Sequence, residues 1–201
     1  MKFSLTVAMA ASIFAASAAY GTDVNPGLVK ASDGAVYGTA GDSKGGTLFK
    51  VNADGSSFAR IHDFSDPSLG TMPLAGIVEG DDGALYGTTS RGGDLSCLPP
   101  GGCGVIFRVN KDGSDYRVLH RFEAYPDGRY PNAAIVADGN LLYGRVETGG
   151  DAAKDCACGA IYQVHLDGSG YKLVHYYNFD TGEGVANLAL GDRVVFQLTA
   201  H

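Results

Sequence analysis

The 201-residue sequence has no tryptophan, few cysteines and fewer basic than acidic residues. The basic residues number 15 and the acidic residues 22, which gives a net charge of −7. Because nucleic acids are bound through an excess of lysine and arginine, we expect no nucleic-acid partner. No stretch reaches the roughly 20 consecutive apolar residues of a membrane-spanning helix, so we also expect no transmembrane segment.

The N-terminus has the order of a secretory signal peptide. Met1 and Lys2 precede an apolar run over residues 3–15, and small residues follow over 16–18. The alternative is a membrane anchor, for which this run is too short. We predict a signal peptide over residues 1–18 and one repeat domain over residues 19–201, secreted or periplasmic. Without Lys2, 14 basic and 22 acidic residues leave a net charge of −8.

The cysteines form two close pairs, Cys97 with Cys103 and Cys156 with Cys158. An oxidising compartment favours disulfides, and the C-x5-C and C-x-C spacings do not match the usual zinc ligand pairs. We therefore expect a local disulfide in the first pair, no metal site and no cofactor. A disulfide within the second pair would close a strained ring, so pairing between copies of the repeat stays open for these two residues.

Thirty glycines and eleven tyrosines indicate tight turns between aromatic strands, and four landmarks recur in step along the chain. They are Tyr37-Gly38, Tyr86-Gly87 and Tyr143-Gly144; Phe49, Phe107 and Tyr162; Asp54-Gly55, Asp112-Gly113 and Asp167-Gly168; and His62, His120 and His175. The last three series are spaced by 58 and then 55 residues. The sequence is thus a tandem repeat.

In the second copy we predict strands over residues 74–79, 84–90, 105–110 and 116–122, with Asp-Gly hairpin turns after the first and third. Four strands joined in order are typical of a propeller blade. We predict an all-β fold, a β-propeller-like array of four-stranded antiparallel blades with three full repeats plus a partial fourth. The alternatives are a solenoid, whose coils would be shorter, and a sandwich, which would not need the same strands three times. The predicted units span about 26–72, 73–130, 131–183 and 184–201.

The second copy also resembles the GloVer tandem repeat. The resemblance rests on residues 83–89 (Gly-Ala-Leu-Tyr-Gly-Thr-Thr), 103–107 (Cys-Gly-Val-Ile-Phe), 110–113 (Asn-Lys-Asp-Gly) and 119–122 (Leu-His-Arg-Phe). It implies an exported bacterial protein with propeller-like repeats, and no particular enzymatic activity. The sequence departs from the family in having no C-terminal anchor segment and few repeats. Propellers have at least four blades, so we expect self-association or a partner chain to cover an open strand edge.

The three histidines occupy equivalent places in the copies, each on a face with aromatic residues. Catalysis needs one histidine beside unlike partners, whereas packing needs the same residue each time, so we interpret them as structural. The Asp-Gly-Ser segments lack the ligand spacing of calcium loops and are interpreted as hairpin turns.

The copies differ mainly between their second and third strands. The distance from the Tyr-Gly tyrosine to the next aromatic landmark is 12 residues in the first copy, 21 in the second and 19 in the third. In a meander, these insertions share one edge of the blade with the linker to the next blade. Our candidate ligand-binding residues at this loop edge are Arg91, Asp94, Tyr125, Asp127, Arg129, Tyr130 and Asp151. Tyrosines could stack on sugar rings while aspartates bind hydroxyl groups.

Three functions remain open. The first is a non-enzymatic binding module for a glycan or an envelope protein. The second is a propeller-type hydrolase or lyase acting on polysaccharide, with Asp94 paired with Asp127 or Asp151 as unlike carboxylates. The third is a structural fragment that needs a partner to close. The sequence shows no catalytic constellation, so we expect binding rather than catalysis.

Overall fold

The computed structural model describes residues 23–24, 27–149, 159–177, 183–190 and 194–200, with only the backbone described for the first range and the last two. The predicted signal peptide, Asp151, Cys156 and Cys158 lie outside these residues. Where the chain is described, its regular structure is β-strand, apart from one 3-10 turn, η1 (Pro67–Leu69). No helix among these residues is long and apolar enough to cross a membrane.

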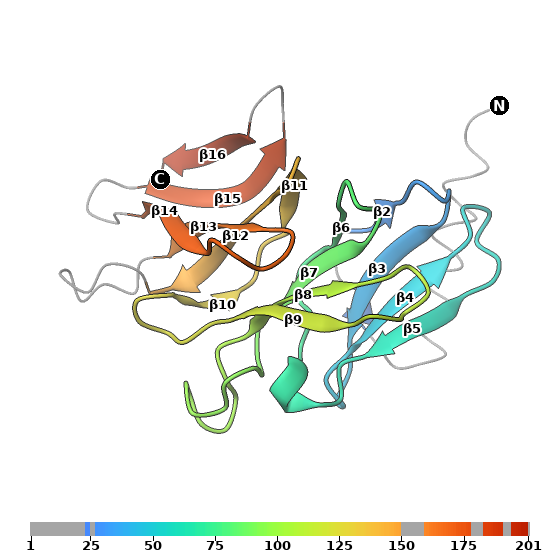
Figure 1. Cartoon of the computed structure of the whole chain (residues 1–201), viewed down its shortest axis with the longest axis horizontal. Helices are drawn as coiled ribbons and strands as arrows, with labels where there is room; N and C mark the ends of the chain where they lie inside the picture. The colour runs from blue at the N-terminus through green and yellow to red at the C-terminus, as the bar shows by residue number, and fades with distance from the viewer. Residues whose placement is uncertain (1–22, 25–26, 150–158, 178–182, 191–193, 201) are drawn as a thin grey trace.

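The strands form four antiparallel sheets that follow one another along the chain (Figure 1). The first blade contains β1 (Asp23–Val24), β2 (Val29–Lys30), β3 (Val36–Gly41), β4 (Thr47–Val51) and β5 (Ala59–Asp63). The second contains β6 (Val78–Glu79), β7 (Leu85–Thr89), β8 (Val105–Val109) and β9 (Arg117–Arg121). The third contains β10 (Arg129–Pro131), β11 (Val136–Asp138), β12 (Leu141–Thr148), β13 (Ala160–His165) and β14 (Lys172–Tyr176). β15 (Glu183–Leu190) pairs with β16 (Val194–Ala200) in a two-stranded fourth sheet.

This arrangement confirms the predicted propeller-like array. Each full blade is a meander in which the second, third and fourth strands pair in chain order. β11, from the first-strand position of the third blade, contacts both β6 and β15. The first strands of successive blades therefore gather side by side, as the innermost strands of a propeller do.

The first strand is broken into two pieces in every blade. β1 and β2 both pair with β3, and β10 and β11 both pair with β12. In the second blade the isolated bridge between Thr71 and Arg91 takes the place of the first piece, and β6 is the second. Our predicted strand over 74–79 was thus too long. Pro73 has no N–H to give to the ladder, and the preceding Met72 has a left-handed φ of 58°.

In the Tyr-Gly landmark the tyrosine packs on one face of the second strand, and the glycine makes room for an aromatic ring on the other. Tyr86 is fully buried in a cluster shared with the third blade, and Gly87 pairs across the sheet with Phe107. A Cβ on Gly87 would lie 2.6 Å from Cζ of Phe107, so only glycine lets this ring lie against its own sheet. Gly38 has the same relation to Phe49, with a separation of 2.8 Å. Gly87 therefore makes room for the ring of Phe107, which faces the first blade.

Successive blades meet at an aromatic joint with the same four positions each time. The first joint consists of His62, Phe64, Phe107 and Tyr116, and the second of His120, Phe122, Tyr162 and Tyr171. In both, the histidine stacks on the tyrosine of the next blade, with ring centroids 3.9 Å and 3.7 Å apart. The tyrosine hydroxyl donates to a linker carbonyl, at 2.7 Å for Tyr116 and 2.6 Å for Tyr171.

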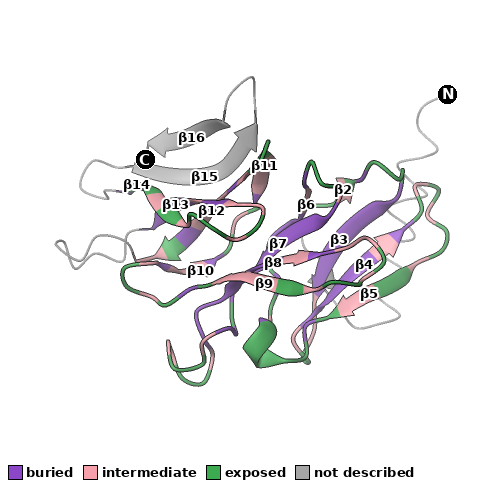
Figure 2. Cartoon of the chain, in the orientation of Figure 1, coloured by how far each residue is buried: buried purple, intermediate pink, exposed green. Residues whose placement is uncertain are grey.

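The repetition of this joint supports the interpretation of His62 and His120 as packing residues. Phe64, Phe107 and Phe122 are at most 1% exposed, and burying a phenylalanine side chain stabilises a fold by about 1.5–3 kcal/mol. Burial also lowers the pKa of His62, since a charged imidazolium is disfavoured among these rings. Figure 2 shows the resulting pattern, with buried residues in the middle strands and exposed residues along η1 and β5.

At the edge of the blades that carries the first hairpin turns, an aspartate holds the buried tyrosine. The hydroxyl of Tyr37 donates to Asp33, and that of Tyr86 donates to Asp82. Burial alone would raise the pKa of Asp33, but hydrogen bonds from Lys50 and Tyr37 outweigh it and lower the pKa to about 2. These carboxylates are ionised parts of the scaffold, at the end of the blade away from the loop edge.

Candidate functional site

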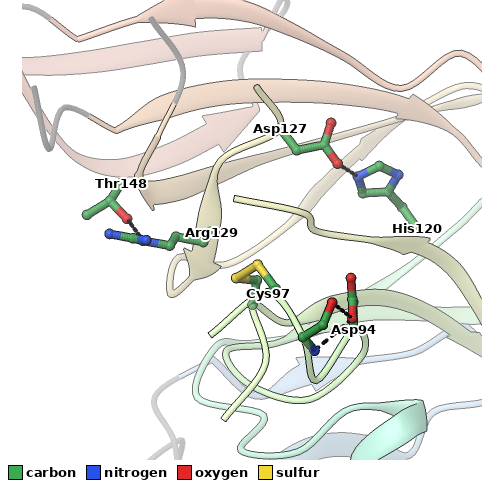
Figure 3. Close-up of a disulfide and its surroundings, with 8 residues drawn as sticks. Asp94, Cys97, His120, Asp127, Arg129 and Thr148 are labelled. Carbon is green, nitrogen blue, oxygen red and sulfur yellow. Dashed lines mark hydrogen bonds and ion pairs between the residues drawn. A yellow bond between two sulfur atoms is a disulfide. The ribbon is translucent and has the colours of Figure 1, made fainter. Parts of the chain in front are cut away.

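The connection between β7 and β8 is tied together by a disulfide and bonded to the linker that enters the blade. Cys97 and Cys103 are joined, as the sequence predicted (Figure 3). The N–H of Gly93 donates to the carbonyl of Pro67 at 2.8 Å, and Thr71 and Arg91 exchange two backbone hydrogen bonds. The insertion and the linker therefore do share one edge of the blade.

The same insertion reaches the next linker as well. The N–H of Tyr130 donates to the carbonyl of Cys103 at 3.1 Å. Tyr130 has a left-handed φ of 58°, the same value as Met72, which stands at the equivalent place one copy earlier. Non-glycine residues adopt such a conformation rarely, and they cluster where a fold holds a functional surface. The two strand breaks are thus built alike.

A pocket of about 320 Å³ lies between these two breaks. It is lined by Met72, Leu74, Ser90, Arg91, Tyr130, Asn132 and Glu147, and we call it the loop-edge pocket. The second blade contributes the first four residues and the third blade the last three. Its volume falls in the range of about 300–1,000 Å³ that small-ligand sites occupy.

Two guanidinium groups flank the aromatic ring in this pocket. The Cζ atoms of Arg91 and Arg129 lie 5.5 Å and 5.7 Å from the ring centroid of Tyr130, which is cation–π distance. Nε of Arg129 also donates to Oγ1 of Thr148 at 2.8 Å (Figure 3). Three of the seven residues that the sequence predicted, Arg91, Arg129 and Tyr130, are therefore brought together.

The other predicted residues do not join this group. Asp94 accepts hydrogen bonds from the N–H and hydroxyl of Ser96, which lower the pKa of its carboxyl group. Oδ2 of Asp127 lies 2.8 Å from Nε2 of His120, so this carboxyl group contacts the second aromatic joint rather than the pocket. Tyr125 is 61% exposed and does not line the pocket. Asp151 lies outside the described residues.

Of the carboxylate pairs considered for a glycosidase, the pair of Asp94 with Asp151 lies outside the described residues, and that of Asp94 with Asp127 can be examined. Asp94 and Asp127 are each engaged by different neighbours, and Figure 3 shows them on separate segments that do not face each other. Among the residues that the structure describes, no three His, Cys, Asp or Glu side chains come together as a metal site would require. The pocket offers hydrogen-bonding groups and one charge of each sign, from Arg91 and Glu147.

Several lining residues were missed from the sequence, namely Met72, Leu74, Ser90, Asn132 and Glu147. One signal could have found some of them. The motif Gly-x-x-Pro-x-Ala occurs at residues 70–75 and again at 128–133, which marks the two strand breaks. The loop insertions drew attention to the right edge of the blade but not to these linkers.

Comparison with solved structures finds the same fold in other chains. A nidogen/laminin complex chain is 21% identical with a TM-score of 0.55, over 78% of this chain and 49% of that one. A putative TolB from Agrobacterium tumefaciens is 15% identical with a TM-score of 0.52, over 77% and 49%. The tricorn protease is 18% identical with a TM-score of 0.51, over 88% and 15%. The chain thus spans about half the length of the first two chains and a smaller part of the third. These likenesses concern the fold alone.

No curated protein matches the sequence. The family model described as "Gloeobacter/Verrucomicrobia repeat" matches the sequence over residues 2–198, which is nearly the whole chain. The same chain has propeller-like structural neighbours, three meander blades and a repeated aromatic joint. The protein belongs to the Gloeobacter/Verrucomicrobia repeat family.

Proposed function

We propose that this protein is an exported, non-enzymatic binding module that takes a glycan or protein ligand in the loop-edge pocket. The observation that carries the proposal is the placement of Arg91 and Tyr130 in one pocket between two blades, with the guanidinium group of Arg129 beside the same tyrosine ring. Binding sites are commonly built from loops and linkers on a rigid scaffold, and this scaffold is held by aromatic joints on both sides of the second blade.

Export is supported by two independent features. The N-terminal sequence has the order of a signal peptide, and the disulfide between Cys97 and Cys103 requires an oxidising compartment to persist. A ligand outside the cytoplasm, such as an envelope or extracellular glycan, fits that location.

The lining of the pocket favours a glycan over a flat protein surface. Met72 and Leu74, which are 38% and 40% exposed, offer apolar contact for the C–H face of a sugar ring. Beside them, Nδ2 of Asn132 donates to Oε2 of Glu147 at 3.1 Å. The remaining oxygens of this pair can bind hydroxyl groups.

The test is binding to an array of neutral and acidic oligosaccharides by the mature protein and by Asn132→Trp, which fills the exposed mouth of the pocket. We expect the wild-type protein to bind at least one oligosaccharide class and Asn132→Trp to lose that binding. Ala59→Trp, on the exposed edge strand of the first blade, is the matched control and should bind like the wild type. The proposal is wrong if no oligosaccharide binds above background, or if Asn132→Trp binds unchanged.

A further inference from the structure

The two arginines beside Tyr130, of which Arg91 lines the loop-edge pocket, arise from a break in the repeat symmetry. In the second blade Thr71 pairs with Arg91, and at the equivalent place in the third blade Arg129 pairs with Thr148. Arginine and threonine have exchanged strands between the copies. Because the exchange puts one arginine on each side of the boundary between the blades, both guanidinium groups reach the ring of Tyr130.

Hydrogen bonds hold the backbone of Arg91 and the side chain of Arg129 in place before any ligand arrives. The backbone of Arg91 is fixed by two hydrogen bonds with Thr71, at 2.9 Å and 3.1 Å. The Nε atom of Arg129 is bound to Thr148, which leaves its two terminal NH2 groups as donors. A guanidinium fork matches the two oxygens of a carboxylate.

Neither arginine is neutralised within the described part of the chain. Five lysine and arginine side chains there form ion pairs with aspartate or glutamate, whereas Arg91 and Arg129 have no carboxylate within 4.0 Å. Two uncompensated positive charges beside one ring are unusual in a chain whose net charge is −7. They make this spot attractive to an anionic group.

Glu147 restricts where such an anion can sit. Its carboxylate, bonded to Asn132, lines the same pocket and would repel a second negative charge close to it. An extended ligand with its anionic group at the arginines and its hydroxyl groups at Asn132 and Glu147 satisfies both sides. A run of aspartate or glutamate residues offers no hydroxyl groups for that second side.

We infer that the loop-edge pocket binds an oligosaccharide that carries a carboxylate, a uronic acid unit being the simplest case. The carboxylate accepts from Arg91 in the pocket and is attracted by the charge of Arg129 beside Tyr130, the sugar hydroxyls bond to Asn132 and Glu147, and a C–H face lies on Met72 and Leu74. This inference rests on the proposed function, because it names the ligand class of the same pocket.

The test uses tetragalacturonate as the probe and its methyl ester as the uncharged match, with affinity measured by isothermal titration calorimetry. We expect esterification to weaken binding roughly tenfold or more, which corresponds to the loss of a charge-assisted hydrogen bond. Raising the salt concentration should weaken binding of the acid, because the arginines are partly exposed to solvent.

Two variants locate the effect. Arg91→Gln and Arg129→Gln should each weaken tetragalacturonate binding roughly tenfold and leave binding of the methyl ester nearly unchanged. Arg117→Gln is the control, since Arg117 lies on β9 in an ion pair with Asp115 and should bind like the wild type.

The outcomes separate this inference from the proposed function. If the ester binds as tightly as the acid and Asn132→Trp abolishes both, the pocket is a glycan site but the acidic ligand is wrong. If tetraglutamate competes as well as tetragalacturonate, the ligand is an acidic peptide and the inference fails. If Asn132→Trp and the arginine variants leave all binding intact, both proposals fail together.

Discussion

Replacing Gly87 by alanine tests the role of the Tyr-Gly landmark. The new Cβ would lie 2.6 Å from Cζ of Phe107, whereas carbon atoms rest at about 3.5–4.0 Å, so the ring must move by roughly 1 Å. Phe107 is fully buried, and its ring already touches those of Phe64 and Tyr116 at 5.2 Å and 5.6 Å between centroids. The displacement is therefore passed into the joint with the first blade.

The expected cost follows from two opposing effects. Overpacking a core costs about 1–3 kcal/mol, and removing the flexibility of a glycine in a strand returns about 0.5–1 kcal/mol. We expect the free energy of unfolding to fall by about 1–2 kcal/mol. In a chain of this length, that lowers the Tm by about 2–8 °C.

Urea unfolding of a double-mutant cycle with Phe107→Leu is the assay. In the Phe107→Leu background the Gly87→Ala change should cost less than about 0.5 kcal/mol, because the clashing ring is gone. Gly41→Ala is the matched control, since a Cβ there meets nothing within 4 Å, and it should leave stability unchanged or raise it. Additive effects of Gly87→Ala and Phe107→Leu would refute the reasoning.

Three further predictions concern the joints and the disulfide. Burial lowers the pKa of His62 below the unfolded value of about 6.5, so the unfolded chain takes up the proton first and the unfolding free energy should fall as the pH drops from 7 to 5. Urea titrations should show a smaller fall for His62→Gln than for the wild type. An equal fall in both proteins would contradict the prediction. Tyr116→Phe and Tyr171→Phe each remove one hydroxyl bond to a linker carbonyl and should each lower stability by about 1 kcal/mol in calorimetry, whereas markedly unequal losses would argue against equivalent joints. Replacing Cys97 and Cys103 together by alanine opens a short loop and should lower the free energy of unfolding by about 2 kcal/mol in thermal unfolding. An unchanged free energy of unfolding would contradict this prediction and would mean that backbone hydrogen bonds alone hold the loop.

The blades could be predicted from the sequence because each landmark has a local physical cause. An Asp-Gly turn, a glycine under a ring and a histidine among aromatics each constrain one short segment, and their recurrence in step reveals the repeat. The structure agrees with these assignments at β7, β8 and β9, where the predicted strands differ from the observed ones by one residue at most at either end. The local disulfide followed from spacing and compartment.

The pocket was harder to predict because its residues come from four separate segments, one of which carries Met72 and Leu74. Arg91 follows β7, Tyr130 lies in β10 and Glu147 lies in β12, so only the docking of two blades brings them together. Asp94 and Asp127 were predicted as ligand-binding residues because they are polar and lie at the loop edge. Their hydrogen bonds to Ser96 and His120 show that each has a local structural partner, which loop position alone does not reveal.

The division of the loop-edge pocket between two blades ties ligand binding to the cohesion of the fold. Tyr171 of the third blade bonds to the carbonyl of Asp127, two residues before Arg129, so separating the blades would release the linker and pull the two arginines apart. A ligand that binds only the docked form adds its own free energy to the joint and raises the resistance of the whole array to unfolding. Occupancy could therefore be followed as thermal protection of the aromatic joint, without any label on the ligand.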